Sequence, residues 1–249
     1  MTAAQSKLRT ERGVDGLFGN FSNMGDFLTV ALLRAVPALI CITIHELAHG
    51  YTAYKLGDST AKDMGRLTLN PIKHIDPIGL LMMLMVGFGW AKPVPVDMRN
   101  FKYPKWYMAI SAFAGPLSNM ILAVIVMFIA GFVAIPLGSN ANDITMTIFT
   151  LLRITVFLNI ALAVFNMLPF PPLDGSKVLF SLLPEKWYYK VLRYERYGMI
   201  VLLVIMSSQL FFNIDIFSRT IGQLARTIES GFGVFFNLGL VLFYRIGIA

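Results

Sequence analysis

His45, Glu46 and His49 form the pattern His-Glu-x-x-His inside an apolar stretch that runs from Phe27 to Tyr54. A helix advances about 1.5 Å and 100° per residue, so residues four apart lie one turn apart on the same face. The two imidazoles can therefore converge on one metal ion. Glu46 is rotated off this face by one residue, where its carboxylate could take a proton from a metal-bound water. The pattern predicts two metal ligands and a general base.

A simpler interpretation is that two hydrogen-bonded histidines and an unrelated glutamate share a helix, as happens in soluble proteins. The surrounding stretch is apolar enough for a membrane, however. An ionisable group near the centre of a bilayer costs roughly 2.5–3.5 kcal/mol on insertion scales, and such groups mark functional sites. We therefore favour the metal site.

The composition indicates a membrane protein. Of the 249 residues, 56% are hydrophobic and 14% are charged, and the mean hydropathy is +0.66. Apolar runs recur along the whole chain, so we expect an all-α polytopic membrane protein with about five to six transmembrane helices. The net charge is +7, but the basic residues lie in loops between apolar runs. There they report orientation in the lipid bilayer, and no nucleic acid partner is expected.

We expect one membrane-embedded domain, residues 26–249, after an N-terminal extension, residues 1–25. No polar stretch is long enough to fold as a separate regulatory or peptide-binding domain. The extension carries Lys7, Arg9 and Arg12 ahead of an apolar run, which resembles a signal peptide. The metal motif inside that run argues against cleavage.

The apolar runs also predict the order of the membrane elements. Ile78–Phe88 is about half the length of a spanning helix, so it should enter and leave on one side as a re-entrant segment. Gly87–Asp97 mixes prolines with alternating valines and predicts an extended edge or a short β-hairpin that dips into the membrane. Helices are expected over Asp26–Leu56, Lys105–Leu137 with a break at Gly115-Pro116, Met146–Leu168, Tyr197–Phe212 and Phe232–Ile248.

A hydrolytic zinc site usually takes three protein ligands and one water, so the two histidines need a partner. Pro169, Pro171 and Pro172 stop the helix that ends near Leu168, and Asp174 follows on irregular backbone. Our topology places Asp174 at the depth and on the side of the histidines. It could be no more than a turn residue, but we expect it to be the third ligand. The other acids, among them Asp58, are given solvated loop positions.

Other candidate ligands are weaker. Cys41 lies about 12 Å along the helix axis from His49, too far to share an ion, and we expect a small buried residue there. His74 lies in a polar turn and is expected to have a structural or hydrogen-bonding role. Asn119 and Asn159 are interpreted as polar contacts between membrane helices.

Two separated motifs together carry a family resemblance. His-Glu-Leu-Ala-His at residues 45–49 and Asn-Met-Leu-Pro-Phe-Pro-Pro-Leu-Asp-Gly at residues 166–175 resemble the site-2 protease family, peptidase M50, whose members are intramembrane zinc metalloproteases. Residues 115–119 and the basic segment from Gly87 to Asn100 add to the likeness. The chain is similar to the compact bacterial branch without a PDZ or CBS domain, which implies a multi-pass protein of the bacterial inner membrane.

The resemblance also implies roles. His45, His49 and Asp174 would bind one Zn²⁺ per chain, and Glu46 would be the catalytic base. Asn166 would orient the substrate or stabilise the oxyanion, although it could equally be a hydrogen-bonding residue without chemistry.

The expected function is hydrolysis of peptide bonds in transmembrane or membrane-associated protein substrates. A helix hides its carbonyls in internal hydrogen bonds, so such a substrate must unwind locally. The alternative is a membrane zinc transporter or a non-hydrolytic metal-binding membrane protein, because intramembrane His and Asp also mark ion pathways. The chain has three histidines and no His-rich loop, which argues against a transport pathway for metal ions.

Overall fold

The computed structural model describes the backbone of residues 24–86, 89–134, 143–212 and 216–246. These residues are mostly helical, and the β-structure among them is an isolated antiparallel bridge between Ile75 and Ala91. The elements are α2 (Met24–Lys55), α3 (Thr60–Asp63), η2 (Pro71–His74), α4 (Pro77–Val86), η3 (Met98–Asn100), α5 (Pro104–Ala134), α7 (Asp143–Asn166), α8 (Asp174–Phe180), α9 (Glu185–Phe212), α10 (Ile216–Gly231) and α11 (Gly233–Ile246).

Contacts divide the chain into two units, Met1–Val36 and Pro37–Ala249. The described part of the first unit is the beginning of α2. The second unit contains the rest of α2 and every later element, including all the residues discussed below.

Three of the described helical stretches are long and apolar enough to cross a membrane. They are Pro104–Ala134, Ile144–Asn166 and Thr220–Ile246. The predicted helical membrane protein is therefore confirmed. The larger number of spans, the re-entrant segment and the hairpin remain predictions.

The predicted helix bounds agree with α2, α5, α7 and α11 to within three residues at each end. The predicted break at Gly115-Pro116 is wrong, because α5 continues through Pro116. Pro116 has no N–H to donate to the carbonyl of Ala112 one turn earlier, and membrane helices tolerate such an internal proline. We did not predict α10 as a helix.

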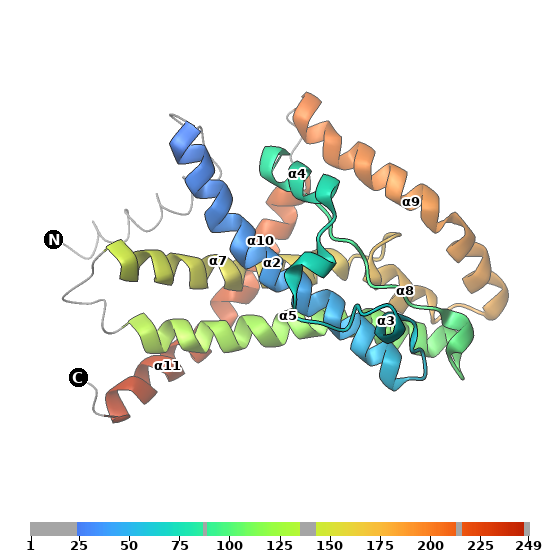
Figure 1. Ribbon diagram of the computed structural model, residues 1–249, viewed down its shortest axis with the longest axis horizontal. Coiled ribbons are helices and arrows are strands. Elements are labelled where there is room, and N and C mark those ends of the chain that lie inside the picture. The colour runs from blue at the N-terminus through green and yellow to red at the C-terminus, as the bar shows by residue number, and fades with distance from the viewer. Residues whose placement is uncertain (1–23, 87–88, 135–142, 213–215, 247–249) are drawn as a thin grey trace. The chain divides into compact units, whose positions relative to one another are not determined.

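The apolar core of the second unit lies where α5, α7 and α10 meet, and Figure 1 shows α5 and α7 running side by side. Its buried residues are Ala123, Val126 and Met127 of α5, Val156 and Ile160 of α7, and Ala225 of α10. Because Ala123, Ile160 and Ala225 are fully buried, this core fixes α5 against α7 and so fixes the two helices that flank the candidate site.

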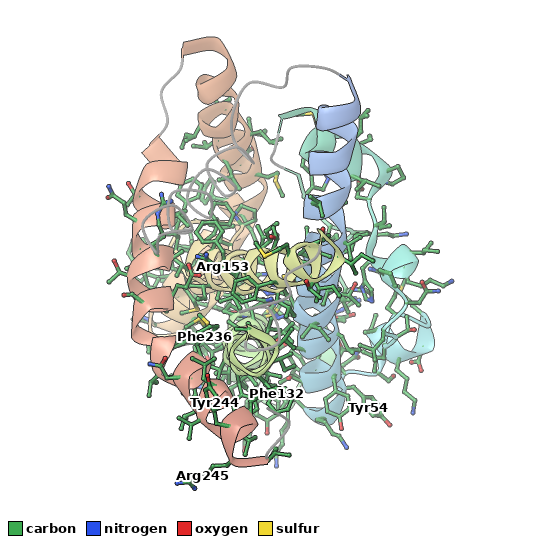
Figure 2. The ribbon with its side chains drawn as sticks, turned by 90° about the vertical axis from the view of Figure 1, so that its left-hand side faces the viewer. Tyr54, Phe132, Arg153, Phe236, Tyr244 and Arg245 are labelled. Carbon is green, nitrogen blue, oxygen red and sulfur yellow. The ribbon has the colours of Figure 1, made fainter. Side chains whose placement is uncertain are left out.

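α11 packs against α5 through two glycines. A Cβ at Gly131 would collide with the carbonyl of Phe236, and one at Gly239 with the carbonyl of Phe128. Small residues allow this close approach of backbones, which stabilises helix pairs in membranes. Figure 2 labels Phe132 of α5 and Phe236 of α11 where the two helices adjoin.

Candidate metal centre

α2 and the start of α8 bring three metal-binding side chains together. His45 and His49 lie one turn apart on α2, and α8 begins at Asp174. The two Nε2 atoms are 3.0 Å apart, and each lies 3.1 Å from Oδ2 of Asp174. His45 and Asp174 are buried, and His49 is half-buried. These are the three residues that the sequence predicts as metal ligands.

Nδ1 of His45 begins a series of hydrogen bonds through Asn119 and Asn159 in which each donor and acceptor can be assigned. The amide group of Asn119 donates to Asn159 Oδ1 (2.6 Å) and to the carbonyl of Cys41 (3.1 Å). Its oxygen, 2.6 Å from His45 Nδ1, is therefore left to accept. The amide group of Asn159 in turn donates to the carbonyl of Thr155 (2.8 Å). Nδ1 of His45 must carry the proton, and its Nε2 presents a lone pair.

His49 is held in the same way by α5. Its Nδ1 lies 2.7 Å from the carbonyl oxygen of Ser111, which can only accept. The hydroxyl of Ser111 donates back to the carbonyl of His49 (3.0 Å). Nδ1 of His49 therefore also carries the proton, and the lone pair of its Nε2 points towards His45 and Asp174.

This arrangement fits a cation. In the neutral rings, both Nε2 atoms are acceptors, and so is the carboxylate oxygen that faces them, so none of the three can donate to another. A metal ion between them relieves the repulsion. Two ligand atoms about 2.0–2.1 Å from a tetrahedral zinc lie roughly 3.3–3.4 Å apart, which is close to the separations of 3.0 and 3.1 Å found here. Two imidazoles and one carboxylate are a ligand set of catalytic zinc sites.

Two glycines make room for these ligands. A Cβ at Gly115 would collide with the ring of His49 and lie 2.8 Å from Cε1 of His45. A Cβ at Gly175 would collide with the carbonyl of Met167 at the end of α7. Glycine at the first position lets α5 pass beside the imidazoles, and glycine at the second lets the start of α8 fold back onto α7.

The second carboxylate oxygen of Asp174 faces a lysine. Nζ of Lys177 lies 3.9 Å from Oδ1 of Asp174 and 3.8 Å from Oε1 of Glu195. The cation is one turn further along α8, so it attracts one oxygen while the other is directed at the histidines. Contacts of this kind orient ligating carboxylates in metal sites.

Glu46 lies next to the ligands in sequence but faces a different part of the chain. Its Oε2 accepts a hydrogen bond from the backbone N–H of Val94 (2.7 Å). Val94 belongs to the segment for which we predicted an extended edge or a β-hairpin, and the described residues 89–97 form no helix or strand ladder apart from the isolated bridge at Ala91. Glu46 thus sits off the ligand face, as its position in the motif requires.

Asn166 is not among the residues that meet at the centre. Its amide group donates to the carbonyl of Leu162 in its own helix (3.0 Å), and none of its described hydrogen bonds goes to the histidines or Asp174. Cys41 is 1% exposed, as expected for a small buried residue. The structural role expected for His74 is confirmed, since it is buried and its Nε2 lies 2.9 Å from the carbonyl of Thr68.

The solvated position that we gave to Asp58 is wrong. Asp58 is fully buried and accepts hydrogen bonds from the backbone N–H of Asp97 (2.7 Å), from the side chain of Asn100 (2.7 Å) and from Thr60. Burial raises the pKa of Asp58, but the hydrogen bonds outweigh it and hold the pKa below its ordinary value of 3.8. The carboxylate therefore anchors residues 97–100 to the end of α2.

The sequence contained a signal for part of this support. Gly115 and Asn119 lie four residues apart, and because α5 continues through Pro116 they share one face, towards the histidines. We interpreted Asn119 as an ordinary polar contact between helices, and we did not single out Ser111 or Lys177. The contact of Ser111 with His49 joins residues 62 apart, which periodicity does not reveal. Lys177 lies only three residues after Asp174, and that spacing could have indicated it.

Comparisons with known proteins identify the family of this chain. The family model described as "Peptidase family M50" matches residues 128–208. The chain is 44% identical over 179 residues to "Putative zinc metalloprotease YwhC" of Bacillus subtilis, covering 70% of this chain and 80% of that protein. It is 26% identical over 185 residues to a protein of Mycolicibacterium smegmatis named Rip2, covering 72% and 68%. No solved structure matches significantly. The chain belongs to peptidase family M50, the site-2 protease family.

Proposed function

We propose that this protein is an intramembrane zinc metalloprotease in which His45, His49 and Asp174 hold the zinc ion. The observation that supports this most directly is the set of three acceptor atoms that face one another, 3.0–3.1 Å apart. Both histidines have their protons committed to other partners on the far side of the ring. The comparisons do not favour the alternative of a zinc transporter.

Zinc, when bound, polarises the scissile carbonyl and lowers the pKa of a coordinated water. As the oxygen of the attacking water bonds to the carbonyl carbon, Glu46 takes a proton from that water. Glu46 then returns the proton to the leaving amine as the C–N bond breaks. Its Oε2 is held by Val94, so its Oε1 is the oxygen for proton transfer. Asn166, at the end of α7, is proposed to orient the substrate or to stabilise charge on the carbonyl oxygen.

The substrates are proposed to be transmembrane or membrane-associated proteins. Because a helical substrate has no free carbonyl, it must be unwound before water can attack. Three helical stretches long and apolar enough to cross a membrane support this proposal, and His45 and Asp174 are buried while His45 is linked through Asn119 of α5 to Asn159 of α7.

Substitution of the base tests the activity. The probe is a pool of labelled transmembrane peptides in vesicles of phosphatidylethanolamine and phosphatidylglycerol, and mass spectrometry detects the cleaved bonds. Glu46→Gln keeps the shape of the side chain and removes the base, so it should retain zinc and lose cleavage. Asp174→Ala should lose zinc as well. Wild-type cleavage rates in Glu46→Gln, or full zinc content in Asp174→Ala, would contradict the assigned roles.

We also propose a multi-pass arrangement in a bacterial inner membrane, with residues 26–249 as one protease domain after the extension 1–25. α4 would be a re-entrant segment and residues 87–97 a short hairpin. The sequence of residues 138–143, of which 138–142 lie outside the described residues, has no Lys or Arg, whereas residues 186–196 are basic. This supports an external position for the first and a cytoplasmic position for the second. An impermeant thiol reagent should label a cysteine at Asn140 from outside and leave one at Lys190 unlabelled. The reverse labelling would invert the topology.

A further inference from the structure

Residues 92–97, here called the strap, lie along the helix that carries Glu46. Val94 is 7% exposed. A Cβ at Gly50, one turn after Glu46, would lie 2.7 Å from Cγ1 of Val94. The strap therefore rests directly on α2, at a position where any side chain larger than hydrogen would push it away.

The strap offers Glu46 a single donor in a fixed register. Proline has no backbone N–H, and Pro93 and Pro95 flank Val94, so Val94 carries the only N–H of residues 93–95. That N–H donates to Oε2 of Glu46 (2.7 Å). A shift of the strap by one residue in either direction would put a proline opposite the carboxylate and leave it without this partner.

The strap is fastened at both ends. Nη2 of Arg66 donates to the carbonyls of Lys92 (2.8 Å) and Pro93 (3.2 Å), immediately before Val94. The backbone N–H of Lys92 donates to the carbonyl of His74 (2.9 Å). At the other end, Asp58 accepts from the N–H of Asp97 (2.7 Å). Val94 thus lies between two segments that hydrogen bonds hold in place, residues 92–93 and Asp97.

Burying Arg66, which holds one end of the strap, costs free energy. Arg66 is 6% exposed, and among the described residues no ion pair includes it. A buried guanidinium that contacts only neutral carbonyls costs free energy, and an apolar side chain at this position would avoid that cost. Packing alone does not explain an arginine here, whereas its two hydrogen bonds to the carbonyls of Lys92 and Pro93 do.

We propose that the strap is a positioning device for the general base: the N–H of Val94 orients the Glu46 carboxylate, and Arg66 and Asp58 hold Val94 at the required register. The inference rests on the proposed role of Glu46. One carboxylate oxygen is tied to Val94, and the other is left to face the attacking water. Misplacing a catalytic group by about 1 Å can cost on the order of 100-fold in rate.

A pair of substitutions at one position tests the N–H itself. Val94→Pro removes the donor, and Val94→Ala keeps the donor while removing the side chain that packs on Gly50. Both are measured on the peptide that the wild-type enzyme cleaves fastest from the pool described above. We expect kcat to fall about 10- to 100-fold in Val94→Pro, with KM and zinc content unchanged. In Val94→Ala, kcat should stay within about threefold of wild type.

Equal kcat values in the two variants would overturn the proposal. So would a raised KM with unchanged kcat in Val94→Pro, because the N–H would then contact the substrate instead of Glu46. Cleavage by Glu46→Gln at the wild-type rate would instead overturn the proposed function.

Arg66 supplies a second test if Val94→Pro does not fold. Arg66→Gln should lower kcat with KM and zinc content unchanged, and Arg66→Lys should restore part of the rate, since it keeps a charged donor. The matched control is Arg99→Gln: Arg99 is exposed and pairs with the side chain of Asp97, so kcat should not change. Equal kcat values in Arg66→Gln and Arg99→Gln would show that the strap does not act through Arg66.

Discussion

The bond between His45 and Asn119 gives a prediction whose size follows from the structure. Asn119 is fully buried and has three partners: it accepts from His45 and donates to Asn159 and to the carbonyl of Cys41. Asn119→Leu removes all three bonds. Asn119→Asp removes the two donors and keeps an acceptor for His45. The difference between the variants therefore reports the acceptor that orients the imidazole together with the negative charge that Asp adds beside it.

Residues that orient a metal-binding histidine typically contribute 10- to 100-fold in metal affinity, or about 1.4–2.7 kcal/mol. We expect Asn119→Leu to bind zinc more weakly than Asn119→Asp by at least that factor. Both variants leave the same two buried acceptors unpaired, at roughly 1–3 kcal/mol each. Both should therefore lose thermal stability, and this shared loss cancels from the comparison of affinities.

The assay is competition with a zinc chelator on protein purified in detergent, with thermal unfolding as the check on folding. Ser118→Ala is the matched control, because Ser118 neighbours Asn119 but, among the described residues, its hydroxyl donates to the carbonyl of Gly115 in its own helix. It should bind zinc as the wild type does. Equal affinities for the Leu and Asp variants would refute the reasoning that Asn119 holds His45 for the metal.

Two further predictions concern space and charge. Gly115→Ala places a methyl group against the ring of His49, so it should lower zinc content while α5 remains helical; full zinc content by mass spectrometry would contradict this. Asp58 has a pKa in the folded protein below its ordinary value of 3.8, so the carboxylate stabilises the fold at pH values above 3.8. This stabilisation is lost as the pH falls through the folded pKa. Thermal unfolding from pH 6 down to pH 3 should show this decline, and Asp58→Asn should flatten it; identical pH dependences would show that Asp58 is not the group responsible.

The local parts of the fold and site could be read from the sequence. The spacing of His45 and His49 is a property of one helix turn, and the apolar runs set the bounds of α2, α5 and α7. Asp174 was identified by combining a proline-rich stop with the expected depth of the chain, and it lies 3.1 Å from both histidines.

What could not be read depends on contacts across long stretches of chain. Val94 is 48 residues from Glu46, and Asp97 is 39 residues from Asp58. A polar residue in a short turn gives the same local signal whether it faces solvent or accepts buried hydrogen bonds, so Asp58 was misplaced. Gly115-Pro116 gave a similar error, because the glycine there makes space for imidazoles rather than ending the helix.

The distance along the chain between the histidines and Asp174 also sets an order of events during synthesis. His45 and Asp174 are 129 residues apart. At about 5–20 residues per second, a ribosome needs roughly 6–26 seconds to pass from one to the other. During that interval the nascent chain has both histidines and Glu46 but lacks Asp174, which follows α7 at the start of α8. The three candidate ligands can therefore meet only after α7 has been synthesised, so assembly of the metal centre is a late step in the synthesis of the chain.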